Sequence, residues 1–205
     1  MRKVKADKRL PASERKEIIL DVARSTFIEY GYEGAHMELI AERAGVTKPI
    51  LYRHFPGKLD LLLAVLDQDG AELLSNISLT TGEEVDWRES IALDVKAYLD
   101  FVESHSEGYI MIYSSGVGID RKVAERVALM RDGTRKIIAE HIRYYVDMDA
   151  VPPEDIDFLA AMVGGMTETA AMYWIRNDKI TREVCERNLV HGIEKIVADL
   201  PSRKG

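Results

Sequence analysis

The chain has 205 residues, of which 46% are hydrophobic and 31% charged, with a formal net charge of −7. This composition provides enough apolar residues for a substantial core, and the length suits a small domain joined to a larger one. The single cysteine, Cys185, excludes an intrachain disulfide and any metal site built from several cysteines. No apolar run is long enough to span a membrane, and the start MRKVKADKRL lacks the apolar segment of a secretory signal. We therefore expect a cytoplasmic protein.

The charge is distributed unevenly along the chain. Residues 1–60 contain 12 Lys/Arg and 9 Asp/Glu, a balance of +3, whereas residues 61–205 contain 16 and 26, a balance of −10. Binding to nucleic-acid phosphates requires local positive charge, so the N-terminal region is where such binding is expected. Residues 1–12 are predicted to be a flexible basic tail, which is either a solvated extension or an arm that reaches along DNA.

The first predicted helix covers residues 13–30. Ile19, Val22 and Phe27 mark its buried stripe, and Ser13 is a candidate N-cap without the carboxylate of a full capping box. Gly31 marks the expected end of this helix.

Residues 37–55, MELIAERAGVTKPILYRHF, show the pattern of two short helices joined by a tight turn. Gly45 provides a residue that can take positive φ where the first helix ends. Thr47 is an expected N-cap and Pro49 lies in the first turn of the second helix, where its missing N–H is not needed. Leu51 and Phe55 can face the core, which leaves a basic and aromatic surface outside. This pattern is typical of a helix-turn-helix that reads DNA with its second helix.

The same residues resemble the TetR family of bacterial transcriptional regulators. The resemblance is carried by Gly31-Tyr32, then by the run IAERAGVT from Ile40 to Thr47, and then by LYRHF from Leu51 to Phe55 with Lys58 and Leu61. It covers about the first third of the chain. Two departures stand out: Ala35-His36 replaces a common Thr before the second helix, and Pro49-Ile50 replaces a common Gly-Thr. The second change favours apolar base contact, such as with a thymine methyl group.

The resemblance implies an all-α fold of about nine helices, with a three-helix DNA-binding domain at residues 13–58 and a helical effector-binding and dimerisation domain at residues 59–205. It implies a homodimeric repressor that binds a palindromic operator in double-stranded DNA. Thr47, Tyr52, His54 and Lys58 are expected at phosphates, and Lys48, Pro49, Ile50 and Arg53 at base edges, with Gly45 shaping the turn. Two alternatives stay open: Tyr52 as a packing residue and His54 as a cap for a local carbonyl.

The remaining chain is predicted to be nearly all helix. The expected segments are residues 58–79, 83–105, 107–114, 120–146, 153–177 and 181–200. By resemblance, the last two form a four-helix bundle with a second copy of the chain. The expected interface residues are Gly164, Gly165, Ala170, Ala171, Leu189, Ile193, Ile196 and Val197, and plain intrachain packing is the alternative for each.

The resemblance also implies a pocket for a small, largely apolar effector in this second domain. Aromatic, methionine and threonine side chains are the candidates to line it, with core packing as the alternative for each: Tyr98, Phe101, Tyr109, Met111, Tyr113, Met130, Met162, Met166, Thr167, Met172 and Tyr173. Glu168 and Thr169 are further candidates for polar contacts.

An enzyme is not expected, because the chain contains none of the common nucleophile, phosphate-loop or metalloprotease motifs. No catalytic residue, cofactor or metal site is predicted. The acidic residues between 147 and 157 fit a solvated loop better than a metal cluster. A third class stays open: a TetR-like protein that organises DNA or binds a protein partner without a small effector. A fillable apolar cavity would favour the effector reading over this one.

Overall fold

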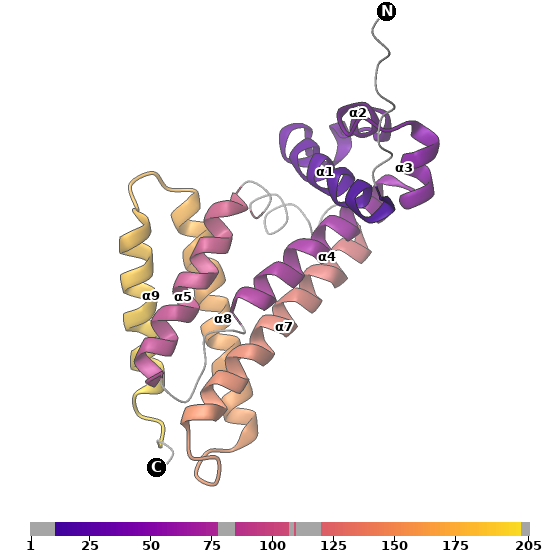
Figure 1. Cartoon of the computed structure of the whole chain (residues 1–205). Helices are drawn as coiled ribbons and strands as arrows, with labels where there is room; N and C mark the ends of the chain where they lie inside the picture. The colour runs from indigo at the N-terminus through magenta and orange to yellow at the C-terminus, as the bar shows by residue number, and fades with distance from the viewer. Residues whose placement is uncertain (1–10, 78–84, 107–108, 110–119, 202–205) are drawn as a thin grey trace, which may run out of the picture. The chain divides into compact units, whose positions relative to one another are not determined.

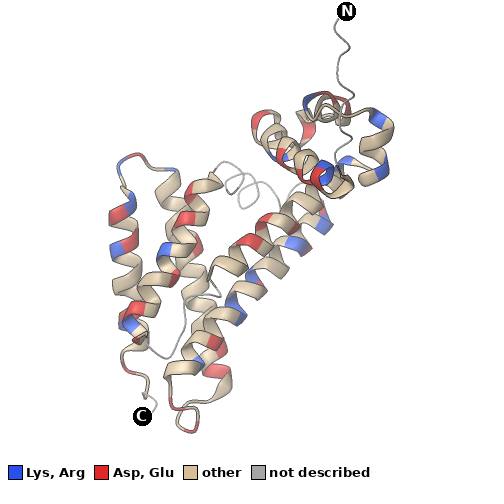
Figure 2. Cartoon of the chain, in the orientation of Figure 1, with Lys and Arg blue, Asp and Glu red and all other residues tan. Residues whose placement is uncertain are grey.

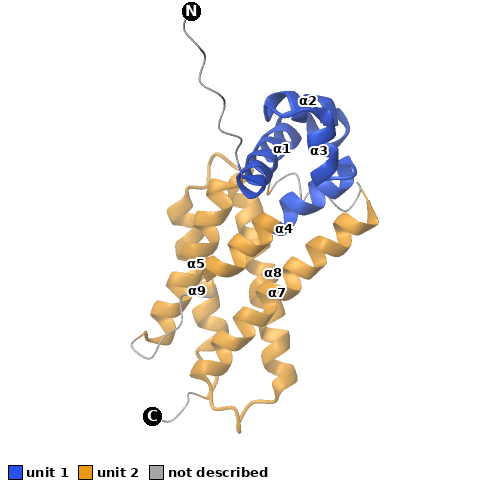
Figure 3. Cartoon of the chain, turned by 45° about the vertical axis from the view of Figure 1, so that its right-hand side comes forward, with its two compact units in different colours: residues 1–67 blue, residues 68–205 orange. Residues whose placement is uncertain are grey.

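The computed structural model describes residues 11–77, 85–106, 109 and 120–201, and within these ranges it contains eight helices and no strand (Figure 1). The expected all-α fold is therefore confirmed. The chain divides into two compact units, residues 1–67 and 68–205 (Figure 3). The expected domain boundary after residue 58 coincides with the start of a long helix, α4 (Lys58–Ile77), whereas the units divide within that helix.

Unit 1 contains α1 (Ala12–Gly34), α2 (Met37–Arg43), α3 (Lys48–His54) and the first part of α4. Helix α1 begins after Pro11, so Ser13 lies inside the helix and the expected cap at Ser13 is wrong. Gly31 leaves the helical conformation as expected, with φ 68°, although a last turn continues to Gly34. Apolar side chains from each helix are fully buried in this unit, among them Phe27, Ile40, Leu51 and Leu61. This shared core fixes the angle between α2 and α3.

Unit 2 contains the rest of α4 with α5 (Trp87–Ser104), α7 (Arg121–Tyr145), α8 (Pro153–Ile175) and α9 (Arg182–Val197). Each of these helices falls within a predicted segment, while residues 107–114 lie outside the described part except for Tyr109. Helix α8 packs against α5, α7 and α9, and α5 also packs against α9 (Figure 1). The largest apolar cluster of the unit joins residues such as Leu99 of α5, Val163 of α8 and Leu189 of α9.

Two glycines set a close approach between α4 and α7. A Cβ added at Gly70 of α4 would lie 3.0 Å from the side chain of Met130 of α7. A Cβ added at Gly133 of α7 would lie 3.0 Å from Leu74 of α4. Each helix thus places a large side chain against a glycine of the other, one turn apart.

None of the helices in the described part of the chain combines the length and the hydrophobicity that a membrane span requires.

Candidate nucleic-acid interface and ligand cavity

The turn between α2 and α3 is a complete Schellman motif. The N–H of Val46 donates to the carbonyl of Ala41 over 3.0 Å, and the N–H of Gly45 donates to Glu42 over 3.1 Å. Gly45 takes φ 64°, a conformation that L side chains rarely adopt. The last carbonyls of α2 are therefore satisfied while the chain reverses sharply into α3.

Helix α3 begins at Thr47 in the N-cap position, with the carbonyl of Thr47 accepting from the N–H of Ile50 and Leu51. The Thr47 side chain makes no capping hydrogen bond, so its hydroxyl stays available to a ligand. Leu51 and Phe55 are buried as expected, and Ile50 is half-buried. The outward face carries Thr47, Lys48, Pro49, Tyr52 and Arg53.

This face is basic, as Figure 2 shows for α3. Lys48 forms an ion pair of 2.7 Å with Glu38 of α2, and the hydrogen bond from Lys48 lowers the pKa of the Glu38 carboxyl. Arg53 is exposed and has no ion-pair partner among the described residues. Tyr52 has 44% of its surface exposed, which argues against the alternative of a packing residue. Glu38 was not predicted to take part, because sequence spacing alone does not show that α2 and α3 bring it beside Lys48.

His54 and Lys58 are more engaged inside the unit than the sequence suggests. The Nε2 atom of His54 is buried and has no hydrogen-bond partner in the described part of the chain. Burial, followed by the nearby charges of Arg53, Arg15 and Lys16, lowers the pKa of His54. The Lys58 ammonium donates to the carbonyls of Tyr32 (2.6 Å) and Glu33 (3.2 Å) and lies 4.4 Å from the centre of the Tyr32 ring. It therefore secures the end of α1, with one donor left for a phosphate.

The influence of Arg15 and Lys16 on His54 shows that the basic start of α1 lies close to the end of α3. Arg15 and Lys16 were not among the residues predicted to contact DNA, although they follow shortly after the basic residues 1–9 in the first turns of a helix whose opposite face is buried.

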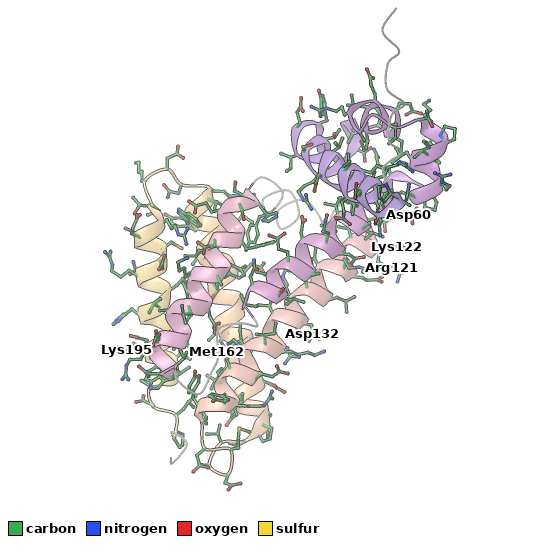
Figure 4. All side chains as sticks on the ribbon, in the orientation of Figure 1. Asp60, Arg121, Lys122, Asp132, Met162 and Lys195 are labelled. Atoms are coloured by element: carbon green, nitrogen blue, oxygen red, sulfur yellow. The ribbon has the colours of Figure 1, made fainter. Side chains whose placement is uncertain are left out.

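Unit 2 contains a partly open cavity of about 700 Å³, which is lined by α5, α7, α8 and α9 and by Ile77 of α4. This volume lies within the range of ~300–1,000 Å³ typical of small-molecule sites. Branched aliphatic side chains form much of its apolar lining, for example Ile91, Val95, Ile138 and Val163. Charged and polar side chains also line it, including an ion pair between Arg131 of α7 and Glu168 of α8 with N–O distances of 2.5 and 2.8 Å. Asp132, labelled in Figure 4, is another.

Two of the eleven predicted pocket residues, Tyr98 and Thr167, line this cavity, and so do Glu168 and Thr169. Phe101, Tyr109 and Met130 are buried elsewhere, and Met166 and Met172 pack against the apolar cluster of unit 2. Met162 and Tyr173 are exposed on α8, while Met111 and Tyr113 lie outside the described residues. The signal that marks the cavity is a polar stripe on α5, Ser90, Asp94 and Tyr98, which faces inward between apolar residues.

The residues predicted for a dimer interface fall into two groups. Ala171, Leu189 and Ile193 are buried in the intrachain core, which favours intrachain packing for these three. Ala170, Ile196, Val197 and Gly164 are half-buried, and Gly165 is exposed with no atom within 4 Å of a Cβ added there. Helix α8 also exposes an uncharged stripe at helical spacing, which we call the α8 stripe: Phe158, Met162, Gly165, Thr169 and Tyr173 (Met162 in Figure 4). Gly165 and Thr169 of this stripe also line the cavity.

Comparison with known proteins agrees with both parts of this description. Residues 19–65 match the family model "Bacterial regulatory proteins, tetR family", and residues 87–195 match "Tetracyclin repressor-like, C-terminal domain". The HTH-type transcriptional activator FasR of Mycolicibacterium smegmatis is 32% identical over 171 residues, which is 83% of this chain and 77% of FasR. The HTH-type transcriptional repressor AcnR of Corynebacterium efficiens is 33% identical over 100 residues, covering 43% of this chain and 52% of AcnR.

Solved structures share the fold at low sequence identity. A tetR-family regulator from Streptomyces coelicolor superposes with a TM-score of 0.78 at 23% identity, over 92% of this chain and 82% of that one. The fatty acid degradation regulator FadR from Bacillus halodurans gives 0.75 at 18% identity, over 96% of this chain and all of that one. The helix-turn-helix, the helical second unit and these matches lead to one conclusion: the chain belongs to the TetR family of DNA-binding transcriptional regulators, which are not enzymes.

Proposed function

We propose that the protein binds a palindromic operator as a homodimer and leaves it when a small, largely apolar effector occupies the cavity of unit 2. The observation that carries the DNA-binding part is the outward face of α3, where Thr47, Lys48, Tyr52 and Arg53 stand on a helix fixed by the Schellman turn. Side chains of these types donate to phosphates and base edges. Release of the protein from DNA raises or lowers transcription according to the position of the operator relative to the promoter. Relatives in this family are named as an activator and as a repressor.

The cavity supports the effector part of the proposal. Its branched aliphatic residues stabilise a bound apolar ligand by removing apolar surface from water. A volume of about 700 Å³ accommodates a ligand of substantial size. Such a cavity favours a ligand-responsive regulator over an architectural protein without an effector. The ligand must bind the released conformation more tightly than the operator-bound one, because equal affinity for both would shift nothing.

The α8 stripe supports the dimer. Phe158 and Tyr173 are large aromatic residues, yet their exposed fractions are 69% and 61%. No charged residue interrupts the stripe between them. Two recognition helices that read a palindrome must lie one DNA turn apart, ~34–36 Å, or a multiple of it, and a two-fold dimer provides this. Changing Met162 to Glu should reduce dimerisation measured by sedimentation, whereas the same change at the exposed Leu129 of α7 should not.

The first test is selection of bound duplexes from a random DNA pool by the purified protein. We expect enrichment of one palindrome. Binding to it should fall by roughly 10³–10⁵-fold between about 50 and 200 mM salt if ~6–10 phosphates are contacted. Lys48→Ala and Tyr52→Ala should weaken binding to that palindrome, whereas Lys179→Ala, an equal change of charge on an exposed turn of unit 2, should not. Equal affinity in the wild type and in both α3 variants would refute the role assigned to α3.

A further inference from the structure

One hydrogen-bonded pair stands out in the cavity, between His141 of α7 and Asp94 of α5. The Nδ1 atom of His141 lies 2.7 Å from Oδ2 of Asp94, and both residues line the cavity. The His141 side chain is 11% exposed and that of Asp94 25%. The pair therefore lies at the inner wall rather than on the outer surface of the unit.

This contact determines which ring nitrogen is left without a partner in the protein. A carboxylate only accepts hydrogen bonds, so Nδ1 of His141 must carry the proton that lies between the two groups. In the neutral ring the lone pair is then on Nε2. Within the described part of the chain, Nε2 has no hydrogen-bond partner and is not among the fully buried atoms. With the ring neutral, the cavity thus contains a hydrogen-bond acceptor of fixed orientation that the protein itself does not use.

The charges around the cavity indicate what kind of donor fits. The described lining contains three arginines, Arg88, Arg131 and Arg135, and three carboxylates, Asp94, Asp132 and Glu168. Arg131 pairs with Glu168 and Arg135 with Asp132, whereas Asp94 is hydrogen-bonded to His141 and the guanidinium of Arg88 lies over the Trp87 ring. The formal charge of the six charged residues sums to zero, so a charged ligand that must lose its hydration gains little net electrostatic attraction in the cavity.

We propose that His141, positioned by Asp94, is the polar anchor of the effector cavity, and that the effector is an uncharged apolar molecule carrying a hydroxyl group that donates to Nε2. This inference rests on the proposed function of the cavity and specifies its ligand class. The aliphatic lining binds the carbon skeleton, and the His141 lone pair distinguishes an alcohol from a hydrocarbon or an ether of the same size. Asp94 acts as a positioning residue, because it fixes the tautomer without touching the ligand.

Direct binding to the full chain without DNA tests this inference. The probes are 1-decanol, decyl methyl ether, which lacks the donor, and decanoate, which adds a charge. Trp87 lines the cavity, so its fluorescence reports occupancy. We expect decanol to bind about five- to tenfold more tightly than the ether, as expected for one hydrogen bond, and more tightly than decanoate.

The matched variant replaces both partners, His141→Phe with Asp94→Leu, so that no buried carboxylate is left unpaired. It should bind the ether as the wild type does and lose the preference for the alcohol. A control variant, Arg121→Gln with Glu125→Gln, removes an exposed ion pair of α7 away from the cavity and should keep the preference.

A purely structural role for the pair would leave the ratio of alcohol to ether affinity unchanged. Nitrogen NMR of the histidines adds a readout that does not depend on the variant folding. We expect the Nδ1–H tautomer for the neutral ring of His141, with the Nε2 resonance shifting when decanol binds.

The opposite tautomer, equal affinity for alcohol and ether, tighter binding of decanoate, or no saturable binding of any probe would overturn the inference. The proposed function can fail separately. If decanol binds with the expected preference but operator binding is unaffected, the anchor stands and the effector role of the cavity is refuted.

Discussion

The close approach of α4 and α7 leads to a quantitative prediction for Gly133→Ala. Replacing a glycine in a helix interior by alanine favours the helix by about 1 kcal/mol. At Gly133 the new methyl group would lie 3.0 and 3.2 Å from the two terminal carbons of Leu74, closer than ordinary contact. Forcing such a side chain aside costs about 1–3 kcal/mol. The expected net effect is a loss of roughly 0–2 kcal/mol in the free energy of unfolding of unit 2.

Gly192→Ala provides the matched control. Gly192 lies in the interior of α9, and a Cβ there would meet Met166 at 3.5 and 3.7 Å, which is ordinary contact. The helix term is the same at both positions, so this variant should gain about 1 kcal/mol. The difference between the two variants, about 1–3 kcal/mol, isolates the cost of crowding Leu74.

The two tryptophans, Trp87 and Trp174, both belong to unit 2, so denaturant unfolding followed by their fluorescence reports that unit. Protein concentration must be held constant, because association changes apparent stability. In a Leu74→Ala background the crowding disappears, and Gly133→Ala should become stabilising there. Equal stabilisation by Gly133→Ala and Gly192→Ala in the wild-type background would refute a tight α4–α7 contact.

Three further predictions concern unit 1. Gly45→Ala should destabilise it by about 1–2 kcal/mol through backbone strain at φ 64°, because no atom lies within 4 Å of the added Cβ and a steric clash therefore does not contribute. Gly45→Asn should cost less, and hydrogen exchange of the α2 and α3 amides measures both effects. Lys58→Met should lower the stability of unit 1 by about 1–2 kcal/mol in the same measurement, because two carbonyls at the end of α1 lose a charged donor. If Lys58 only contacted phosphate, its replacement would leave the stability of the free protein unchanged. The pKa of His54 is lowered in the folded protein, so its contribution to stability is present above the ordinary histidine pKa of about 6.5 and is lost as the pH falls below that value. Acid unfolding of His54→Gln should therefore depend less strongly on pH in this range. An identical dependence in the variant and the wild type would contradict burial of the ring.

The helix-turn-helix could be predicted from sequence because its determinants are local. Gly45 at positive φ and buried Leu51 each follow from a short run of residues, and the structure confirms them. The partners of the charged residues were not predictable in the same way. Glu38 beside Lys48, and Lys58 on the carbonyls of residues 32 and 33, depend on how the helices cross, which spacing along one helix does not determine.

The cavity illustrates the same limit more strongly. Composition identifies apolar side chains but does not show which of them face a void and which face a neighbour. Met130 packs against Gly70, and the Tyr109 hydroxyl lies 2.8 Å from that of Tyr98, so both fill space instead of enclosing it. The polar stripe of α5 was the better guide, since a buried helix face keeps Ser90 and Asp94 only where they meet a partner or a ligand.

The α4–α7 contact also bears on how an effector would act. Helix α7 contributes His141 and Arg131 to the cavity and meets α4 through Gly133 and Leu74, and α4 continues into unit 1. Under the proposed function, a ligand that moves α7 must move α4 or loosen this contact. A change of 1.4 kcal/mol in the balance between two conformations alters their ratio tenfold. The crowding expected for Gly133→Ala is of this size and would be relieved in a conformation with a looser α4–α7 contact, so the variant should also change the effector concentration needed for release. An unchanged response, together with the expected loss of stability, would show that the signal leaves the cavity by another helix.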